Sequence, residues 1–477
     1  MTAQEKLSIP PQEMPEQEPG VRARNMDEVA LGYPAEAART EASRCLHCAA
    51  KPCMKGCPVA IDIPEFLGKA AEGDFAGALA TIRKSSLLPA VCGRVCPQER
   101  QCQMHCTVGK ILKDSGKAVA IGRVERFCAD FEARAVEEGR LSPPAPELAP
   151  PTGRRVAVIG SGPASITAAA DCARAGHEVT VFEALHKPGG VLVYGIPEFR
   201  LPKKIVEREI ESLRAMGVKF ETNFLAGRTR RIADLLDEDG FDAVFVGTGA
   251  GLPKFMGIEG ENLIGVFSAN EYLTRANLMK AYEEGRADTP FWHGRAVAVL
   301  GGGNVAMDAA RMALRLGADE VHLLYRRSEA EMPARREEVE HAKAEGVRFH
   351  TLQNAKRILG GEDGRVRAVE CLRYTLGEPD ASGRRSPVPV EGSEFEIAAD
   401  TVIVAVGNGS NPLVAATTEG LEVDGRGRIK TDGAGRTSVK GVYAGGDIVL
   451  GAATVILAMG EGRRAAASIN QDLSAGL

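Results

Sequence analysis

The chain of 477 residues carries 59 Lys and Arg against 64 Asp and Glu, which gives a net charge of −5. This length is too great for one ordinary core and predicts roughly three domains. A negative net charge gives no reason to expect nucleic-acid binding, which normally shows as a basic surplus. No apolar run approaches a membrane span and residues 1–6 show no secretory signal, so we expect a cytoplasmic protein that does not bind membranes.

Cysteines mark the first part of the chain, where eight of the eleven lie between Cys45 and Cys106. Such clustering in a cytosolic chain favours metal binding over disulfides. Zinc would accept some of the spacings, but eight thiols beside two nucleotide-binding units favour electron transfer, which redox-inert zinc cannot perform. The two runs read Cys45, Cys48, Cys53 and Cys57-Pro58, then Cys92, Cys96-Pro97, Cys102 and Cys106.

The position of proline in the first run predicts how the ligands divide. In bacterial ferredoxins, the cysteine before proline ligates a different cluster from its three sequence neighbours. Cys57-Pro58 repeats that arrangement. We therefore expect two [4Fe–4S] clusters with crossed ligation: Cys45, Cys48 and Cys53 bind one together with a residue of the second run, and Cys57 joins the other.

Residues 1–150 are expected to form this iron–sulfur domain, with helical patterning over 63–83. The proline-rich stretch 142–151 predicts a stiff linker to the next domain.

A nucleotide-binding unit begins with the apolar strand 155–159, followed by a glycine-rich turn and an alanine-rich helix. The glycines permit the tight turn and close approach that a pyrophosphate at a helix N-terminus requires. Glu183 ends the next strand at the place where an acid usually binds ribose hydroxyls, which suits FAD. A chance surface turn is the weaker alternative. The turn reads Gly160, Ser161, Gly162, Pro163, Ala164 and Ser165, with Ser165 in place of the usual third glycine.

The same pattern recurs at 296–300, so a second nucleotide-binding unit is predicted. The next strand, 320–324, leads to Arg326 and Arg327 instead of an acid, and guanidinium groups there can pair with a 2′-phosphate. NADP(H) is therefore preferred over NAD(H), unless the two arginines are only a solvated charge pair. The second turn reads Gly301, Gly302, Gly303, Asn304, Val305 and Ala306.

Two late strands, 402–407 and 441–447, are expected to return to the first nucleotide-binding domain, so that the second is inserted within it. The expected divisions are an FAD domain at 151–285 and 399–477, and an NADPH domain at 286–398. The predicted fold class is α/β: a helical iron–sulfur domain followed by two Rossmann-like domains.

Long stretches at 93–98, 183–202 and 268–275 resemble the small-subunit family of NADPH-dependent glutamate synthase. Within that family, the chain is most similar to the large subunits of NADH-dependent reduced ferredoxin:NADP oxidoreductases, which are electron-bifurcating transhydrogenases. The resemblance covers nearly the whole chain and implies a glutathione-reductase-like arrangement of the FAD and NADPH domains.

The resemblance also implies the remaining cluster ligands. It makes Cys106 the fourth ligand beside Cys45, Cys48 and Cys53, and it gives the flavin-proximal cluster Cys57, Cys96, Cys102 and Glu125. The bifurcating relatives use glutamate at that position. Without the resemblance, a surface glutamate in a salt bridge would be the better interpretation of Glu125. The resemblance leaves Cys92 without a ligand role, and it is the reserve candidate for the fourth ligand if Glu125 does not bind. Cys128, Cys172 and Cys371 are expected to be buried small hydrophobes.

Further flavin and nucleotide contacts follow from the resemblance. The loop that begins at Gly189 and Gly190 is expected along the flavin, and Gly446-Asp447 at its ribityl and pyrophosphate end. The other candidate cofactor-binding residues are Val191, Gly195, Ile196, Arg200, Gly249, Gly407 and Thr454.

Together these features predict an enzyme that exchanges hydride between NADP(H) and FAD and relays electrons through two [4Fe–4S] clusters. The leading interpretation is a transhydrogenase subunit in a hetero-oligomer, with ferredoxin and a small FAD- and [2Fe–2S]-bearing subunit as partners. The alternatives are the electron-input subunit of glutamate synthase, with its large subunit as partner, and a sulfide dehydrogenase. An idle scaffold or redox sensor is disfavoured because every part of the site is present.

Overall fold

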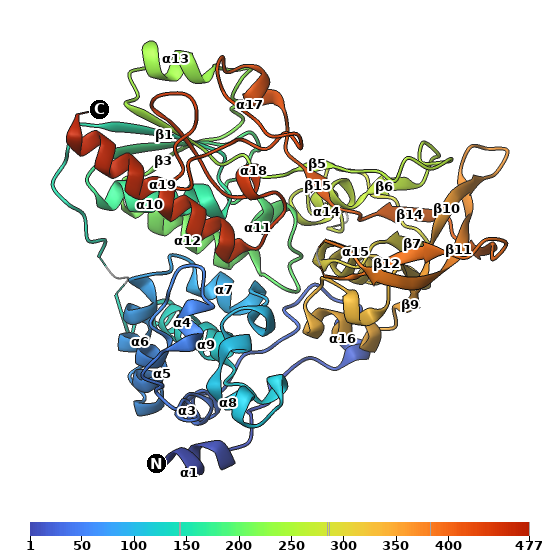
Figure 1. Ribbon diagram of the computed structural model, residues 1–477, viewed down its shortest axis with the longest axis horizontal. Coiled ribbons are helices and arrows are strands. Elements are labelled where there is room, and N and C mark those ends of the chain that lie inside the picture. The colour runs from blue at the N-terminus through green and yellow to red at the C-terminus, as the bar shows by residue number, and fades with distance from the viewer. Residues whose placement is uncertain (143–144, 284, 286, 382, 477) are drawn as a thin grey trace.

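A helical domain and two sheet-based domains make up the computed structural model, which describes residues 1–142, 145–283, 285, 287–381 and 383–476 (Figure 1). The helical domain lies against both of the others. The predicted α/β fold class, with a helical domain ahead of two Rossmann-like domains, is confirmed. Part of the expected linker, 143–144, and the expected domain boundary at residue 286 lie outside the described residues.

The N-terminal domain is built from short helices around one long one, α9 (Ile121–Glu137), which packs on α3, α5, α6 and α7. The helical pattern over 63–83 breaks into two helices at Gly73, whose φ of +88° suits glycine, and Asp74 caps the second helix. The other helices are α1 (Ala3–Ser8), α2 (Pro19–Arg22), α3 (Ala35–Ser43), α4 (Pro52–Lys55), α5 (Ile63–Glu72), α6 (Phe75–Arg83), α7 (Pro89–Val95) and α8 (Thr107–Ile111), with 3₁₀ turns η1 (Gln98–Arg100), η2 (Gln103–His105) and η3 (Ser115–Lys117).

The first nucleotide-binding domain has a five-stranded parallel sheet in the order β16-β4-β1-β2-β3. Four of its strands, all except the edge strand β3, are largely apolar and buried, as expected where helices cover both faces of a sheet. The long α19 lies across α10 (Figure 1). The elements are β1 (Arg155–Ile159), α10 (Pro163–Arg174), β2 (Glu178–Phe182), α11 (Val191–Tyr194), α12 (Lys203–Ala215), β3 (Lys219–Glu221), α13 (Ile232–Asp237), β4 (Ala243–Val246), α17 (Leu413–Ala416), β16 (Val442–Ala444), α18 (Asp447–Leu450) and α19 (Val455–Ala475).

The second nucleotide-binding domain has its own five-stranded parallel sheet, in the order β6-β14-β7-β8-β9. The prediction that strand 402–407 returns to the first domain is wrong, because β14 pairs with β7 and β6 in the second sheet. β6 also precedes the expected boundary at 286. The elements are β6 (Val266–Ser268), α14 (Ala269–Asn277), β7 (Ala296–Leu300), α15 (Asn304–Arg315), β8 (Glu320–Tyr325), η4 (Glu329–Glu331), α16 (Arg336–Ala344), β9 (Arg348–Thr351) and β14 (Thr401–Val404).

Antiparallel strands project from this second domain at the right of Figure 1. A two-stranded ribbon joins the two nucleotide-binding domains and marks where the chain crosses between them. The projecting strands are β10 (Gln353–Gly360), β11 (Val366–Pro379), β12 (Arg385–Pro389) and β13 (Phe395–Ala398), and the ribbon pairs β5 (Leu252–Pro253) with β15 (Asn408–Gly409).

The N-terminal segment runs from the helical domain to α16 of the second nucleotide-binding domain (Figure 1). There Glu16 contacts His341 at 3.0 Å, and Arg22 pairs with Glu345 at 3.2 Å. Among the described residues, no helix combines the length and hydropathy that crossing a membrane would require.

Candidate functional site

Four cysteines, Cys45, Cys48, Cys53 and Cys106, line one small pocket in the helical domain, with apolar side chains such as Ile63 and Leu67 between them. Burial raises the pKa of the Cys53 thiol to about 12, and the neighbouring Cys45 and Cys106 add to the effect. The converging thiols would repel one another as thiolates, and a cationic metal centre would relieve that repulsion. This is the grouping expected for the first cluster.

A second pocket is lined by Cys57, Cys96, Cys102 and Glu125, and Cys92 also reaches its wall. Glu125 is 6% exposed, and its Oε1 atom has no hydrogen-bond partner among the described residues. Burial raises the pKa of Glu125 to about 8. An orphaned buried carboxyl oxygen facing three thiols fits a metal ligand, because a buried acid without a partner is otherwise costly.

The cysteine runs therefore divide between the pockets as the crossed arrangement requires. Cys57 leaves its sequence neighbours and joins the second pocket, while Cys106 joins the first. All eleven cysteines are free thiols. The residues present fit two [4Fe–4S] clusters, one held by four thiolates and one by three thiolates and a carboxylate.

The first glycine turn joins β1 to α10. Gly160 has a φ of +89°, and a Cβ there would lie 2.7 Å from the carbonyl oxygen of Gly247. Glu183 is oriented by this turn: one of its carboxylate oxygens accepts from the N–H and hydroxyl of Ser161, and the other from the N–H of Leu185 at 2.8 Å. The carboxylate thus stands fixed beside the turn where a ribose would lie.

The environment of Ser165 shows how a serine can take the place of the usual third glycine. Its side chain is fully buried, and its hydroxyl donates to the Gly247 carbonyl at 3.2 Å, which ties α10 to the end of β4. The small side chain of serine therefore still allows α10 to pack closely on the end of β4.

The loop after β2 comes very close to the same turn. Gly190 has a φ of +55°, and a Cβ there would lie 2.7 Å from the Cα of Gly162. The Gly189 N–H donates to the Ser161 hydroxyl at 2.8 Å. Gly446 packs just as closely on Ala164, where a Cβ would meet the Ala164 Cβ at 2.7 Å. Three separate segments thus converge on the N-terminus of α10.

The other flavin-loop candidates surround this point. Asp447 opens α18, and burial raises its pKa to about 6. Thr454 caps α19 and accepts a hydrogen bond from Gln101 of the helical domain at 3.3 Å. Val191 begins α11, Gly195 and Ile196 follow that helix, Pro163 begins α10, and Gly249 follows β4 with a φ of +69°.

The second glycine turn joins β7 to α15. Gly301 has a φ of +149°, and a Cβ there would lie 2.4 Å from the Ala405 carbonyl oxygen. The Asn304 side chain accepts a hydrogen bond from the Arg335 N–H at 2.9 Å, so it holds the segment before α16 against the turn. Gly303 is the N-cap of α15, Val305 is exposed, Ala306 is buried, and Gly407 follows β14 with a φ of +106°.

The two arginines after β8 lie in different environments. Arg326 is exposed at the end of the strand. Arg327 is buried: its guanidinium pairs with Asp380 at 2.5 Å and donates to the Arg385 carbonyl at 2.8 Å. The side chain of Arg327 is thus committed to the projecting strands, which differs from the expectation that both arginines face a 2′-phosphate.

Arg200 also differs from its expected place along the flavin. Its guanidinium is buried, donates to both carboxylate oxygens of Asp308 at 2.7 and 2.8 Å, and lies 3.1 Å from Glu338. Arg311 and Glu345 extend this buried network. The Arg200 side chain therefore links the flavin loop to the second nucleotide-binding domain.

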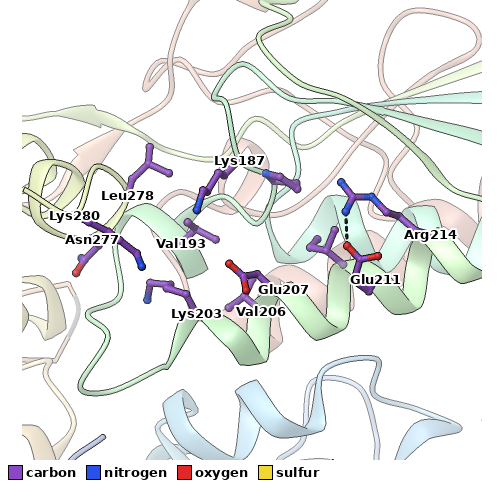
Figure 2. A pocket seen from close by; sticks show the side chains of 12 residues that line it. Lys187, Val193, Lys203, Val206, Glu207, Glu211, Arg214, Asn277, Leu278 and Lys280 are labelled. Atoms are coloured by element: carbon purple, nitrogen blue, oxygen red, sulfur yellow. Dashed lines mark hydrogen bonds and ion pairs between the residues drawn. The ribbon is translucent and has the colours of Figure 1, made fainter. Parts of the chain in front are cut away.

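Figure 2 shows a further pocket, behind the flavin loop, between α12 and the end of α14. Lys187, Lys203 and Lys280 stand at one side of it. Its floor includes Val193 and Val206, which are the side chains that a Cβ on Gly189 would strike. Burial lowers the pKa of Lys203 to about 8, although its ammonium donates to two loop carbonyls. Gly189, in the loop after β2, thus packs closely on two of the apolar side chains that line this pocket.

Several residues that shape the site are not evident from motifs. Ser161 and Asn304 lie inside recognised turns, where their side-chain hydrogen bonds could have been anticipated. Gln101, Asp308 and Arg335 act across domains, and no local pattern marks them.

Two family models match the chain, one over the helical domain and one over both nucleotide-binding domains. Residues 22–137 match the dihydropyrimidine dehydrogenase domain II model with a 4Fe-4S cluster, and residues 154–462 match the pyridine nucleotide-disulphide oxidoreductase model.

Curated relatives and solved structures agree with these matches. The chain is 42% identical over 444 residues to the NADP(+)-dependent formate dehydrogenase subunit beta of Moorella thermoacetica, which covers 89% of this chain but only 60% of that protein. It is 38% identical over 463 residues to the glutamate synthase [NADPH] small chain of Halomonas elongata, which covers 95% of both. Mycobacterium tuberculosis FprA in complex with NADPH shares the fold, with a TM-score of 0.57, 21% identity, and coverage of 68% of this chain and 85% of FprA.

The matched residues include both cysteine pockets and both glycine turns. Cluster thiols, an FAD turn with its acid, and a second turn followed by arginine are thus all present in one chain. The chain therefore belongs to the pyridine nucleotide-disulphide oxidoreductase family, among the glutamate synthase small chains and related NADPH-dependent subunits, and is an FAD-dependent NADP(H) oxidoreductase with [4Fe–4S] centres.

Proposed function

We propose that this chain is the NADP(H)-reactive subunit of an electron-bifurcating ferredoxin:NADP transhydrogenase. The observation that carries the proposal is Glu125, a buried carboxyl with an unpartnered oxygen that faces Cys57, Cys96 and Cys102. A carboxylate among thiolates changes the charge and softness of a cluster's ligands, and both determine its potential. The resemblance noted in the sequence implies glutamate at this place in bifurcating enzymes.

Bound FAD would supply the hydride exchange with the nicotinamide. The residues of the chain would bind and orient: the turn from Gly160 to Gly162 would accept the flavin pyrophosphate at the N-terminus of α10, and Glu183 would accept the ribose hydroxyls. Arg326 would pair with the 2′-phosphate of NADP(H). No side chain needs to move a proton at the reacting atoms.

The first cysteine pocket offers an exit for electrons. Cys48 is the partly exposed thiol of that set, and its Sγ contacts the Thr107 hydroxyl at 3.1 Å, where α8 begins. α8 then presents Lys110 and Ile111 to solvent, and Met104 is exposed on the preceding turn. Exposed apolar side chains beside a lysine suit an acidic electron carrier such as ferredoxin.

A second candidate is the electron-input subunit of glutamate synthase. The nearly end-to-end match to the Halomonas small chain favours it, since that relative and this chain share 95% of their lengths. In both candidate functions this chain would exchange hydride between NADP(H) and FAD and pass electrons through its clusters. The two differ only in the partner that receives the electrons.

Anaerobic purification with native partners tests both. A transhydrogenase should bring a small partner with FAD and a [2Fe–2S] centre, whereas glutamate synthase should bring a larger FMN-bearing partner. NADPH should bleach the flavin of the purified chain. Unbleached flavin, or zinc in place of iron and sulfide, would contradict the enzyme proposal altogether.

A further inference from the structure

Five side chains in the wall of the second pocket, four cysteines and one glutamate, could bind iron, but a [4Fe–4S] cluster needs only four ligands. Cys92 is the fifth. It lies on the last turn of α7, one helical turn before Cys96, and the Cys96 N–H donates to the Cys92 carbonyl at 3.1 Å. Residues spaced by four share a helix face, and both thiols line the same pocket. With Cys57, Cys96, Cys102 and Glu125 as ligands, the Cys92 thiol is left over.

The Cys92 thiol also touches the flavin-binding domain. Its Sγ is a hydrogen-bond donor to the Met459 sulfur at 3.6 Å, and both residues are buried. Met459 belongs to α19, whose N-cap Thr454 accepts from Gln101. Ile456 of the same helix lines the pocket beside Cys92. The thiol thus stands between a proposed cluster ligand and the helix that begins at the flavin site.

The Cys92 thiol is enclosed by sulfur atoms and apolar side chains. It is 1% exposed, lies between Met459 and the core of the helical domain, and has no cationic partner among the residues the structure describes. A thiol can donate one hydrogen bond, and the two sulfur atoms beside Cys92 are those of Met459 and of Cys96, which lines the same pocket.

We propose that Cys92 is a positioning residue that donates its S–H to the Cys96 sulfur when the flavin-proximal cluster is bound. The inference rests on the proposed ligand set for that cluster. A hydrogen bond to a cluster sulfur favours the more negative, reduced state, and such bonds are among the determinants of cluster potential. Met459 competes for the same proton, so contact with α19 tunes the strength of this hydrogen bond.

An anaerobic redox titration followed by electron paramagnetic resonance tests the assignment in the full chain. Cys92→Ala should lower the equilibrium constant for one-electron reduction of the flavin-proximal cluster about tenfold, a shift of about 59 mV to lower potential. Cys92→Ser retains a donor and should restore most of the potential. Cys128→Ala, another buried thiol of the same domain that does not line the pocket, should leave it unchanged, and the all-cysteine cluster serves as internal control.

Met459→Leu provides a second route that leaves Cys92 in place. Without the competing sulfur, the S–H should serve Cys96 alone, and the potential should stay the same or rise. A fall in potential in Met459→Leu, or an unchanged potential in Cys92→Ala with both clusters retained, would overturn the inference. Loss of half the iron in Cys92→Ala would also overturn it, because Cys92 would then be a ligand. An unaltered chain that showed no cluster at this site would instead remove the proposed function.

Discussion

Replacing Arg326 with alanine tests which of two neighbouring arginines binds the 2′-phosphate of NADP(H), because the sequence alone gives Arg326 and Arg327 the same role. Arg326 is exposed beyond β8, whereas Arg327 is held by Asp380 and by the Arg385 carbonyl. Among the described residues, no hydrogen bond or ion pair holds the Arg326 guanidinium, so it can turn toward the 2′-phosphate of NADP(H). The Arg327 guanidinium would first have to break its ion pair. We therefore expect Arg326→Ala to weaken NADPH binding and leave NADH binding nearly unchanged.

The size of the effect follows from the bonds that are lost. Hydrogen bonds to charged groups contribute about 1.5–3 kcal/mol, which corresponds to roughly a 10- to 150-fold increase in the Kd of NADPH. Arg327→Ala should behave differently, because it removes the ion pair with Asp380 and the hydrogen bond to the Arg385 carbonyl, and both hold β8 to the ends of β11 and β12. It should lower stability by about 1–3 kcal/mol and weaken both nucleotides by similar factors.

Both constants are measured by calorimetric titration with NADPH and with NADH of anaerobic, flavin-loaded protein whose flavin has been reduced beforehand, so that neither nucleotide can transfer hydride to it. Arg295→Ala is the matched control, since Arg295 is an exposed arginine of the same domain that pairs with Asp319 at the far end of β7. If Arg326→Ala weakened both nucleotides equally, or if Arg327→Ala alone abolished the preference for NADPH, the assignment of the 2′-phosphate to Arg326 would be refuted.

Three other substitutions test the remaining parts of the site. Glu183→Ala removes the carboxylate beside the first glycine turn and should reduce FAD retention by a factor of roughly 10 to 100. Flavin absorbance after gel filtration measures this loss. The control is Glu178→Ala, an exposed glutamate at the start of β2, the strand that Glu183 follows. Cys45→Ser and Cys102→Ser should each cost about half of the bound iron because they strike different pockets, whereas Cys172→Ser should cost none; full iron in either of the first two would argue against its pocket. Asp308→Ala leaves the buried Arg200 guanidinium short of a partner and should lower the free energy of unfolding by about 3–5 kcal/mol in urea titrations, while exposed Asp319→Ala should change it little.

The parts of the site that sequence predicts well are local. A glycine turn, its strand and its helix lie within about 30 residues, and the positive φ of Gly160 and Gly301 is expected from the motif itself. The approach of Gly190 to Gly162 also lies within one βαβ unit, since Gly190 is in the loop that follows β2. The cysteine runs are similar, because the proline after Cys57 restricts the loop that carries it and sends that thiol to the other pocket.

The errors concern partners that are distant in sequence. The apolar strand 402–407 reads equally well in either sheet, and only its pairing with β7 decides between them. Arg200 lies in a loop whose sequence predicts contact with the flavin, yet its guanidinium binds Asp308, which lies more than a hundred residues later in the chain. Arg327 is likewise drawn to Asp380. A charged side chain shows no periodicity that reveals which acid it will meet.

The contacts of the helical domain indicate why one chain carries both clusters and both nucleotide sites. Gln101 bonds to the cap of α19 on the flavin side, while Arg100 donates to the carbonyls of Met332 and Pro333 beside the second glycine turn. Consecutive residues of the second cysteine run thus touch both nucleotide-binding domains. Electron transfer needs fixed distances between the redox centres. A rigid segment can keep the flavin, the nicotinamide and the flavin-proximal cluster at such distances if it bears cluster ligands and contacts both domains, as this segment does.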